Sequence, residues 1–269
     1  MYAITDPWVP PTRGLLSGMP MPLLLVLGVL TASAGALAAA ELVPLTPARA
    51  VGAGGAQGAL LAMAVTWARS EPRRRAAPLI AAIVVFVGAV GATLSPFGAI
   101  AYLAAPVWLW RQRDRLPAFG LARPPIGICA AGAALGALLG AHLLLTASLT
   151  LGYGVRVPTA AHLMSWLAYD AGANVLTSEA FFRGALLDRA QRRWHFAMAS
   201  AFVTLLSLAR YFVDPLLPHS LEVMAGAVFY LTLLSLANCW MYWCSGSIVP
   251  GIAAGVVFFA CYRLLHVVS

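Results

Sequence analysis

Four side chains that could do chemistry lie within one strongly apolar stretch of this sequence, residues 158–188. They are Asp170, Asn174, Glu179 and Arg183. An ionisable group at membrane depth is costly unless it is paired, faces a water-filled cavity or takes part in function. We therefore expect the functional site of the chain in this stretch.

The spacing of these residues places them on helical faces. Asp170, Asn174 and Ser178 follow one another at intervals of four and form one polar stripe of a helix. Glu179 and Arg183 are also four apart, with the acidic residue first, which favours an ion pair within the helix. Glu179 and Arg183 are therefore candidate functional residues. The alternative is a buried salt bridge that only fixes helix packing.

The composition indicates that this helix lies in a membrane. Of the 269 residues, 61% are hydrophobic and 10% are charged, whereas a soluble domain has about 25% charged residues. The apolar runs are continuous and do not alternate, so they predict transmembrane helices and not a β-barrel. We predict an all-α polytopic bundle of about eight or nine spans, embedded in the lipid bilayer.

Nine apolar runs approach the ~20 residues needed to cross the hydrocarbon core of a bilayer. They are residues 20–42, 50–68, 77–94, 97–110, 126–152, 158–188, 194–213, 220–243 and 246–267. The run 97–110 is short, and the sequence leaves open whether it crosses the membrane. We divide the chain into a polar lead (1–19), N-terminal transmembrane helices (20–157) and core helices (158–269).

The basic residues predict how the chain is oriented. All 17 are arginines, and the formal net charge is +8. They gather in the loops 69–75, 111–123 and 189–193, while the intervening loops carry at most one each. The positive-inside rule then places the N-terminus in the cytoplasm, for a bacterial inner-membrane protein. Because the arginines form no continuous basic face, we expect lipid headgroups and not nucleic acid as their partners.

Two other patterns have structural interpretations. Gly132, Gly136 and Gly140 recur every four residues, a spacing that lets helix backbones approach closely. We expect this stripe to pack within the monomer. His142 and His162 lie in different runs, and we interpret both as packed or hydrogen-bonded histidines and not as metal ligands. No cysteine–histidine spacing resembles a zinc site, so the residues predict no metal and no cofactor.

The residues around Glu179 resemble a known motif. The run Ser-Glu-Ala-Phe-Phe-Arg-Gly at 178–184 is similar to Glu-Glu-x-x-x-Arg, the first motif of the CPBP family of membrane-embedded CAAX-processing and bacteriocin-processing proteases. The run Gly-Ser-Ile-Val-Pro at 246–250 resembles the family's last segment, which precedes a helix bearing a histidine. Residues 202–211 lie where the middle motif, Phe-x-x-x-His, is expected.

This resemblance covers residues 158–267 and implies a core of four helices. It also implies intramembrane endopeptidase activity on a membrane-anchored protein or peptide, with Glu179 and Arg183 in the catalytic site. A divalent metal is expected only if that protease activity is present.

The chain departs from the family pattern at the positions implied to carry the chemistry. Ser178 replaces the first glutamate, the residue that the resemblance implies would activate water. Arg210 lies at the middle histidine position and Gly255 at the last one. None of these three residues can act as a general base at neutral pH. We expect Arg210 to pair with Glu179 or Asp170 instead, which would turn a catalytic centre into a neutral buried network.

Three classes of function are compatible with these observations. The lost residues favour a non-catalytic relative that binds a membrane partner or substrate segment. The alternative is an active endopeptidase that uses Glu179. A transporter or channel lined by the intramembrane charges comes third, because broken helices or inverted repeats would be expected in it and neither is visible in the sequence.

Overall fold

The computed structural model describes residues 15–68, 76–121, 124–212 and 221–266. Within these ranges the chain is helical apart from short connections and a two-stranded sheet. The predicted all-α bundle is therefore confirmed.

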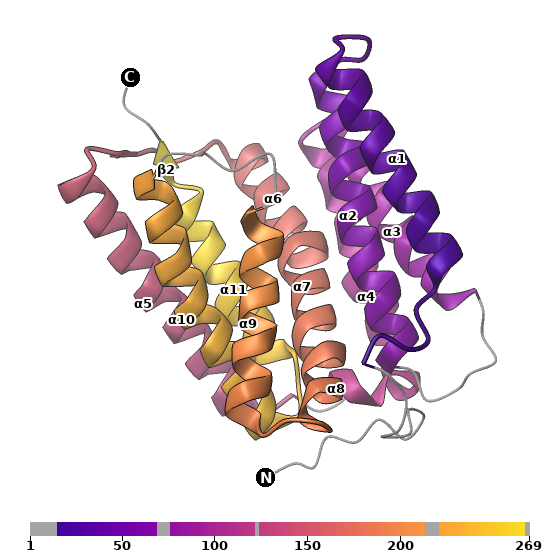
Figure 1. Cartoon of the computed structure of the whole chain (residues 1–269). Coiled ribbons are helices and arrows are strands. Elements are labelled where there is room, and N and C mark those ends of the chain that lie inside the picture. The colour runs from indigo at the N-terminus through magenta and orange to yellow at the C-terminus, as the bar shows by residue number, and fades with distance from the viewer. Residues whose placement is uncertain (1–14, 69–75, 122–123, 213–220, 267–269) are drawn as a thin grey trace.

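The N-terminal helices form one side of the bundle (Figure 1). In chain order they are α1 (Met21–Ala39), α2 (Leu45–Ala68), α3 (Ala77–Leu94), the 3-10 helix η1 (Phe97–Leu103), α4 (Ala104–Arg111) and the single-turn 3-10 segments η2 (Arg113–Arg115) and η3 (Pro117–Phe119). Glycines let α2 lie close to its neighbours. A methyl group at Gly55 would meet Thr31 of α1, and one at Gly58 would touch Ala82 of α3.

The C-terminal helices form the other side (Figure 1). They are α5 (Ile126–Thr150), α9 (Phe196–Phe212), α10 (Leu221–Ser245) and α11 (Val249–Tyr262), with the antiparallel strands β1 (Gly154–Val155) and β2 (Leu265–His266). The predicted glycine stripe lies on α5. An added Cβ at Gly132 or Gly136 would clash with carbonyl oxygens of α11. The stripe thus packs within the monomer, as expected.

The predicted helix 158–188 is present and lies between the two sides (Figure 1). It runs without interruption through α6 (Ala160–Tyr169), the π-helical segment η4 (Asp170–Asn174), α7 (Val175–Phe181), the π-helical segment η5 (Phe182–Leu187) and α8 (Asp188–Gln191). It contacts α2 and η1 on one side and α9, α10 and α11 on the other. Every residue from 175 to 190 is buried, so this central helix forms the core.

Helix length and composition identify the membrane spans. Five described helices are long and apolar enough to cross a membrane: α1, α2, α3, α5 and α10 from Met224 onward. Two further apolar helices, α9 and α11, are shorter. The short run 97–110 forms η1 and α4 in succession. Together they rise by roughly 26 Å, close to the ~30 Å of a hydrocarbon core. The chain is an integral membrane protein.

Candidate polar site between four helices

The predicted site residues gather around a small cavity between the central helix, α9, α10 and α11. Its volume is ≈ 50 Å³, which is large enough for water molecules. The polar side chains that line it are Asn174, Ser178, Glu179, Arg183, Ser207, Arg210, Ser235 and Asn238. Five of the six residues predicted from the sequence therefore meet at this polar cavity, and Asp170 lies next to it.

The predicted ion pair within the central helix is confirmed. Arg183 Nη1 lies 3.2 Å from Glu179 Oε1, and both side chains are buried. Arg183 Nη2 also donates to the carbonyl oxygen of Ser235 at 3.2 Å and to its hydroxyl at 2.5 Å. That hydroxyl in turn lies 2.9 Å from Thr204 Oγ1 of α9. Arg183 therefore ties the central helix to α9 and α10.

A second donor to Glu179 was not predicted from the sequence. Asn238 of α10 is 2% exposed, and its Nδ2 donates to Glu179 Oε1 at 2.9 Å and to the Gly251 carbonyl at 3.4 Å. The backbone of Gly251 confines the same carboxylate, because an added Cβ there would collide with Glu179 Oε2. The signal for Asn238 in the sequence was its place three residues after Ser235 in an otherwise apolar run.

The predicted partner of Arg210 is wrong. Its Nη1 donates to Ser178 Oγ at 2.7 Å and its Nη2 to Asn174 Oδ1 at 3.4 Å. No ion pair joins it to Glu179 or Asp170 in the described part of the chain. Successive residues of a helix point about 100° apart, so the face that meets α9 carries Ser178 and Asn174 while Glu179 turns toward α10 and α11. Ser178 Oγ donates its own proton to the Asn174 carbonyl at 2.6 Å.

Asp170 pairs with an arginine that the sequence analysis did not single out. Arg263, at the end of α11, donates to it through Nε at 2.7 Å and Nη2 at 2.8 Å. Asn174 Nδ2 donates to the same carboxylate at 3.0 Å, as the i, i+4 stripe predicts. Asp170 is fully buried, and the bidentate pair compensates its charge. In the sequence, the presence of an arginine in the last apolar run was the feature that could have indicated that Arg263 pairs with a buried acid.

The segment that contains this site matches a known family model. Residues 160–259 match the family model described as type II CAAX prenyl endopeptidase Rce1-like. Across this segment the chain is similar to the Rce1-like family. No curated protein and no solved structure matches the chain. The Rce1-like segment contains every residue that lines the polar cavity, so the resemblance seen in the motif around Glu179 is confirmed.

The Rce1-like segment has no space for a side chain at the last histidine position. An added Cβ at Gly255 would lie 2.6 Å from Val175 Cγ1 on the central helix. The histidines that the sequence analysis considered lie elsewhere. His142 Nδ1 is 2.7 Å from Tyr230 Oη, and His162 Nδ1 is 2.7 Å from Thr159 Oγ1 at the start of α6. Each histidine makes a local hydrogen bond through Nδ1, and both residues are exposed, so they are hydrogen-bonded and not packed.

The side chains around the polar cavity do not form a suitable set of ligands for a divalent metal. Glu179 is the carboxylate among the described lining residues, and Arg183 already neutralises it. Arg210 places a second guanidinium in the same lining. No group of three His, Cys, Asp or Glu side chains converges anywhere in the described ranges.

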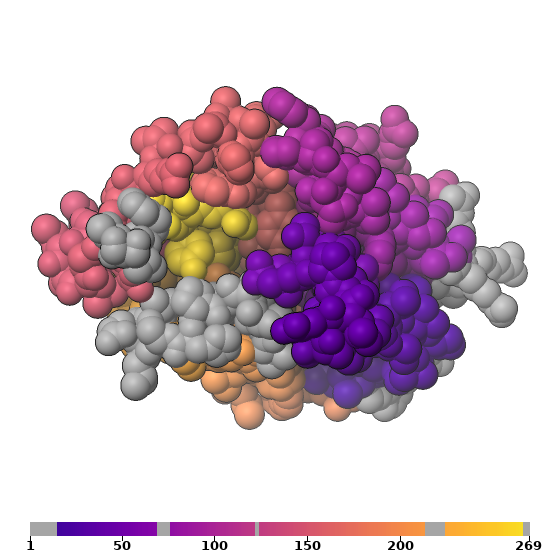
Figure 2. Space-filling model, turned by 90° about the horizontal axis from the view of Figure 1, so that it is seen from above, coloured from indigo at the N-terminus to yellow at the C-terminus, as the bar shows by residue number. Residues whose placement is uncertain are grey.

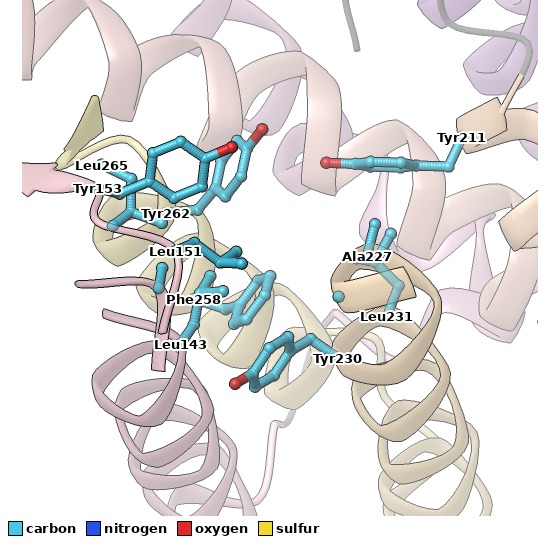
Figure 3. A pocket seen from close by; sticks show the side chains of 12 residues that line it. Leu143, Leu151, Tyr153, Tyr211, Ala227, Tyr230, Leu231, Phe258, Tyr262 and Leu265 are labelled. Atoms are coloured by element: carbon cyan, nitrogen blue, oxygen red, sulfur yellow. The ribbon is translucent and has the colours of Figure 1, made fainter. Parts of the chain in front are cut away.

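A second cavity adjoins the polar one and is almost entirely apolar (Figure 3). Its volume is ≈ 80 Å³. Its aromatic lining consists of Tyr153, Tyr211, Tyr230, Phe258 and Tyr262. Tyr211 and Leu231 line both cavities. Seen from above, the yellow surface of α11 and β2 at this end lies recessed beside α5 and α6 (Figure 2).

Proposed function

We propose that this Rce1-like protein is non-catalytic and that its polar cavity binds a segment of a membrane-anchored protein or peptide. The arrangement of Glu179 carries the proposal. Arg183 and Asn238 both donate to one carboxylate oxygen, and the backbone of Gly251 confines the other. A general base must instead be free to take a proton from a positioned water. Glu179 serves here as an anchor for neighbouring helices.

The replaced histidine positions support the same proposal. Arg210 stays protonated, and its guanidinium donates to Ser178 and Asn174 in the cavity wall. Gly255 has no side chain, and Val175 fills the space in front of it. Hydrolysis of a peptide needs a base for water and donors that stabilise the oxyanion. The described lining offers arginine donors but no second base.

The surroundings of the cavity define what it could bind. It lies among helices that cross or enter the bilayer, so an occupant would have to be a membrane-inserted segment. In our proposal the protein resides in a bacterial inner membrane with its N-terminus in the cytoplasm and its arginine-rich loops on anionic lipid.

One observation favours the alternative, an active endopeptidase that uses Glu179. Its Oε2 atom is buried and has no hydrogen-bond partner among the described residues. A water placed beside that atom would find an acceptor for its proton. This alternative keeps the same cavity and the same membrane-anchored substrate class, so one assay separates it from the non-catalytic proposal.

The test compares wild type with Glu179→Gln in proteoliposomes that contain a membrane-anchored CAAX peptide with a photo-crosslinking group. We expect both proteins to crosslink to the peptide and neither to release a cleavage product. A catalytically active member of the family serves as positive control for cleavage. Cleavage by wild type that Glu179→Gln abolishes would establish the endopeptidase. Absence of crosslinking above protein-free vesicles would refute binding of this substrate class.

A further inference from the structure

The surroundings of Asn238 permit one orientation of its side-chain amide. Both atoms within hydrogen-bond distance, Glu179 Oε1 and the Gly251 carbonyl oxygen, are acceptors. The amide must therefore turn its NH₂ group toward them, since the flipped orientation would bring three oxygens together. The amide oxygen, Asn238 Oδ1, therefore lies on the side away from these two acceptors.

The remaining atom of this amide, Oδ1, has no hydrogen-bond partner among the described residues. Asn238 Oδ1 is buried and accepts no hydrogen bond from a described residue, and the same is true of Glu179 Oε2. A buried acceptor left without a donor is destabilising, because it has lost its hydrogen bonds to water and gained none in return. Both side chains line the polar cavity. An occupant that brings hydrogen-bond donors would remove this cost.

Gly251 makes the arrangement possible. Its carbonyl oxygen accepts from Asn238, and the absence of a side chain leaves room for the carboxylate of Glu179. An added Cβ would also lie 3.3 Å from Asn238 Cγ. Asn238 and Gly251 thus hold Glu179 in place from two different helices, α10 and α11.

We infer that Asn238 is a positioning and specificity residue of this site: it orients Glu179 and offers Oδ1 to an unpaired N–H group of the occupant. The inference rests on the proposed binding of a membrane-inserted segment. A continuous helix has no free backbone N–H groups in its interior, whereas a helix broken near its centre exposes those of its new first turn. The cavity therefore selects a broken helix over an unbroken one.

The experiment uses two synthetic apolar peptides of ~20 residues, long enough to span the bilayer. One carries a central Gly-Pro-Gly-Gly break, and the other has leucines at those four positions. Binding of each labelled peptide to the full-length protein is measured in liposomes by energy transfer. We expect wild type to bind the broken peptide about tenfold more tightly, the equivalent of one satisfied buried acceptor.

Three variants separate positioning from simple stability. Asn238→Leu has a similar volume but no amide, so the ratio of the two affinities should fall to about one. Gly251→Ala displaces Glu179 and Asn238 and should lower the same ratio, which keeps the inference testable if Asn238→Leu does not fold. Gln57→Leu is the matched control. It removes a buried amide that accepts from Thr177 outside the cavity, so it should leave the ratio unchanged.

The outcomes distinguish the inference from the proposed function. If wild type binds neither peptide above protein-free liposomes, the proposed function fails together with the inference. If wild type binds both peptides equally, or Asn238→Leu keeps the tenfold preference, the inference is overturned while the proposed function stands. A preference lost in Asn238→Leu and Gly251→Ala but kept in Gln57→Leu supports it.

Discussion

A carboxylate buried in a membrane protein is stable only when donors replace the water that it has lost. Glu179 meets this requirement with Arg183 and Asn238, which converge on one oxygen. The arrangement extends through Arg183 to Ser235 and Thr204. At the scale of single residues, Glu179 is therefore held by Arg183 of its own helix and Asn238 of α10, and Arg183 extends the network to α9 through Ser235 and Thr204.

Removing the positive partner tests this dependence. Arg183→Ala leaves Glu179 charged and uncompensated in a buried site, so we expect a loss of about 3–5 kcal/mol of stability. Unfolding in mixed detergent and SDS measures it. Arg113→Ala is the control, because Arg113 pairs with Asp114 at the surface over 3.8 Å with side chains 37% and 81% exposed. An exposed pair contributes about 0–1 kcal/mol, and similar losses in both variants would contradict a buried structural pair.

The sequence predicts contacts within a helix better than contacts between helices. The spacing of four that joins Glu179 to Arg183 follows from helix geometry alone, and the structure contains this pair. Which residue of another helix meets them depends on how the helices rotate against one another. For this reason the sequence misassigned Arg210 and gave no specific role to Asn238 or Arg263.

At the scale of elements, the central helix is continuous but not uniform. The sequence predicts one helix at 158–188, and the structure divides it with the π-helical segments η4 and η5 on either side of α7. Such segments are often found at functional sites. No residue type marks an i→i+5 turn, so these segments could not be predicted. By contrast, the spacing of the glycines on α5 predicted that this helix packs closely within the monomer, although it did not indicate that α11 is the partner.

The pair between Asp170 and Arg263 joins the central helix to the end of α11. Beyond it, the Arg156 N–H donates to the Leu264 carbonyl at 2.8 Å, next to the β1–β2 pairing. We expect Arg263→Ala to free this end, so that amides of residues 153–156 exchange hydrogen faster. The double variant Asp170→Ala with Arg263→Ala should lose less stability than the sum of the single variants, with a coupling of about 0.5–3 kcal/mol. Strictly additive losses would show that the pair does not hold α11.

At the scale of the whole molecule, the ends of the helices agree with the arginine pattern. Ala118 and Phe119, which follow the loop at 111–115, contact Tyr242 and Ile248 at the end of α10 and the start of α11. In Figure 1 the same end contains α8, whose Arg189 donates to the Ser17 carbonyl at 2.9 Å. The described arginine-rich segments and the start of the described chain thus share one end. The arginine-rich loop at 69–75 lies outside the described residues.

This shared end predicts the orientation of the protein in the bilayer. Asp114 has a side chain 81% exposed in the arginine-rich loop, and Val157 is 84% exposed in the connection near β1 at the opposite end. We introduce Asp114→Cys or Val157→Cys after replacing the four native cysteines, and label with a membrane-impermeant maleimide. Because arginine-rich loops stay in the cytoplasm, right-side-out vesicles should label only Val157→Cys and inverted vesicles only Asp114→Cys. Detergent should make both accessible, which controls for occluded thiols. The reverse pattern would place the N-terminus outside and overturn the proposed topology.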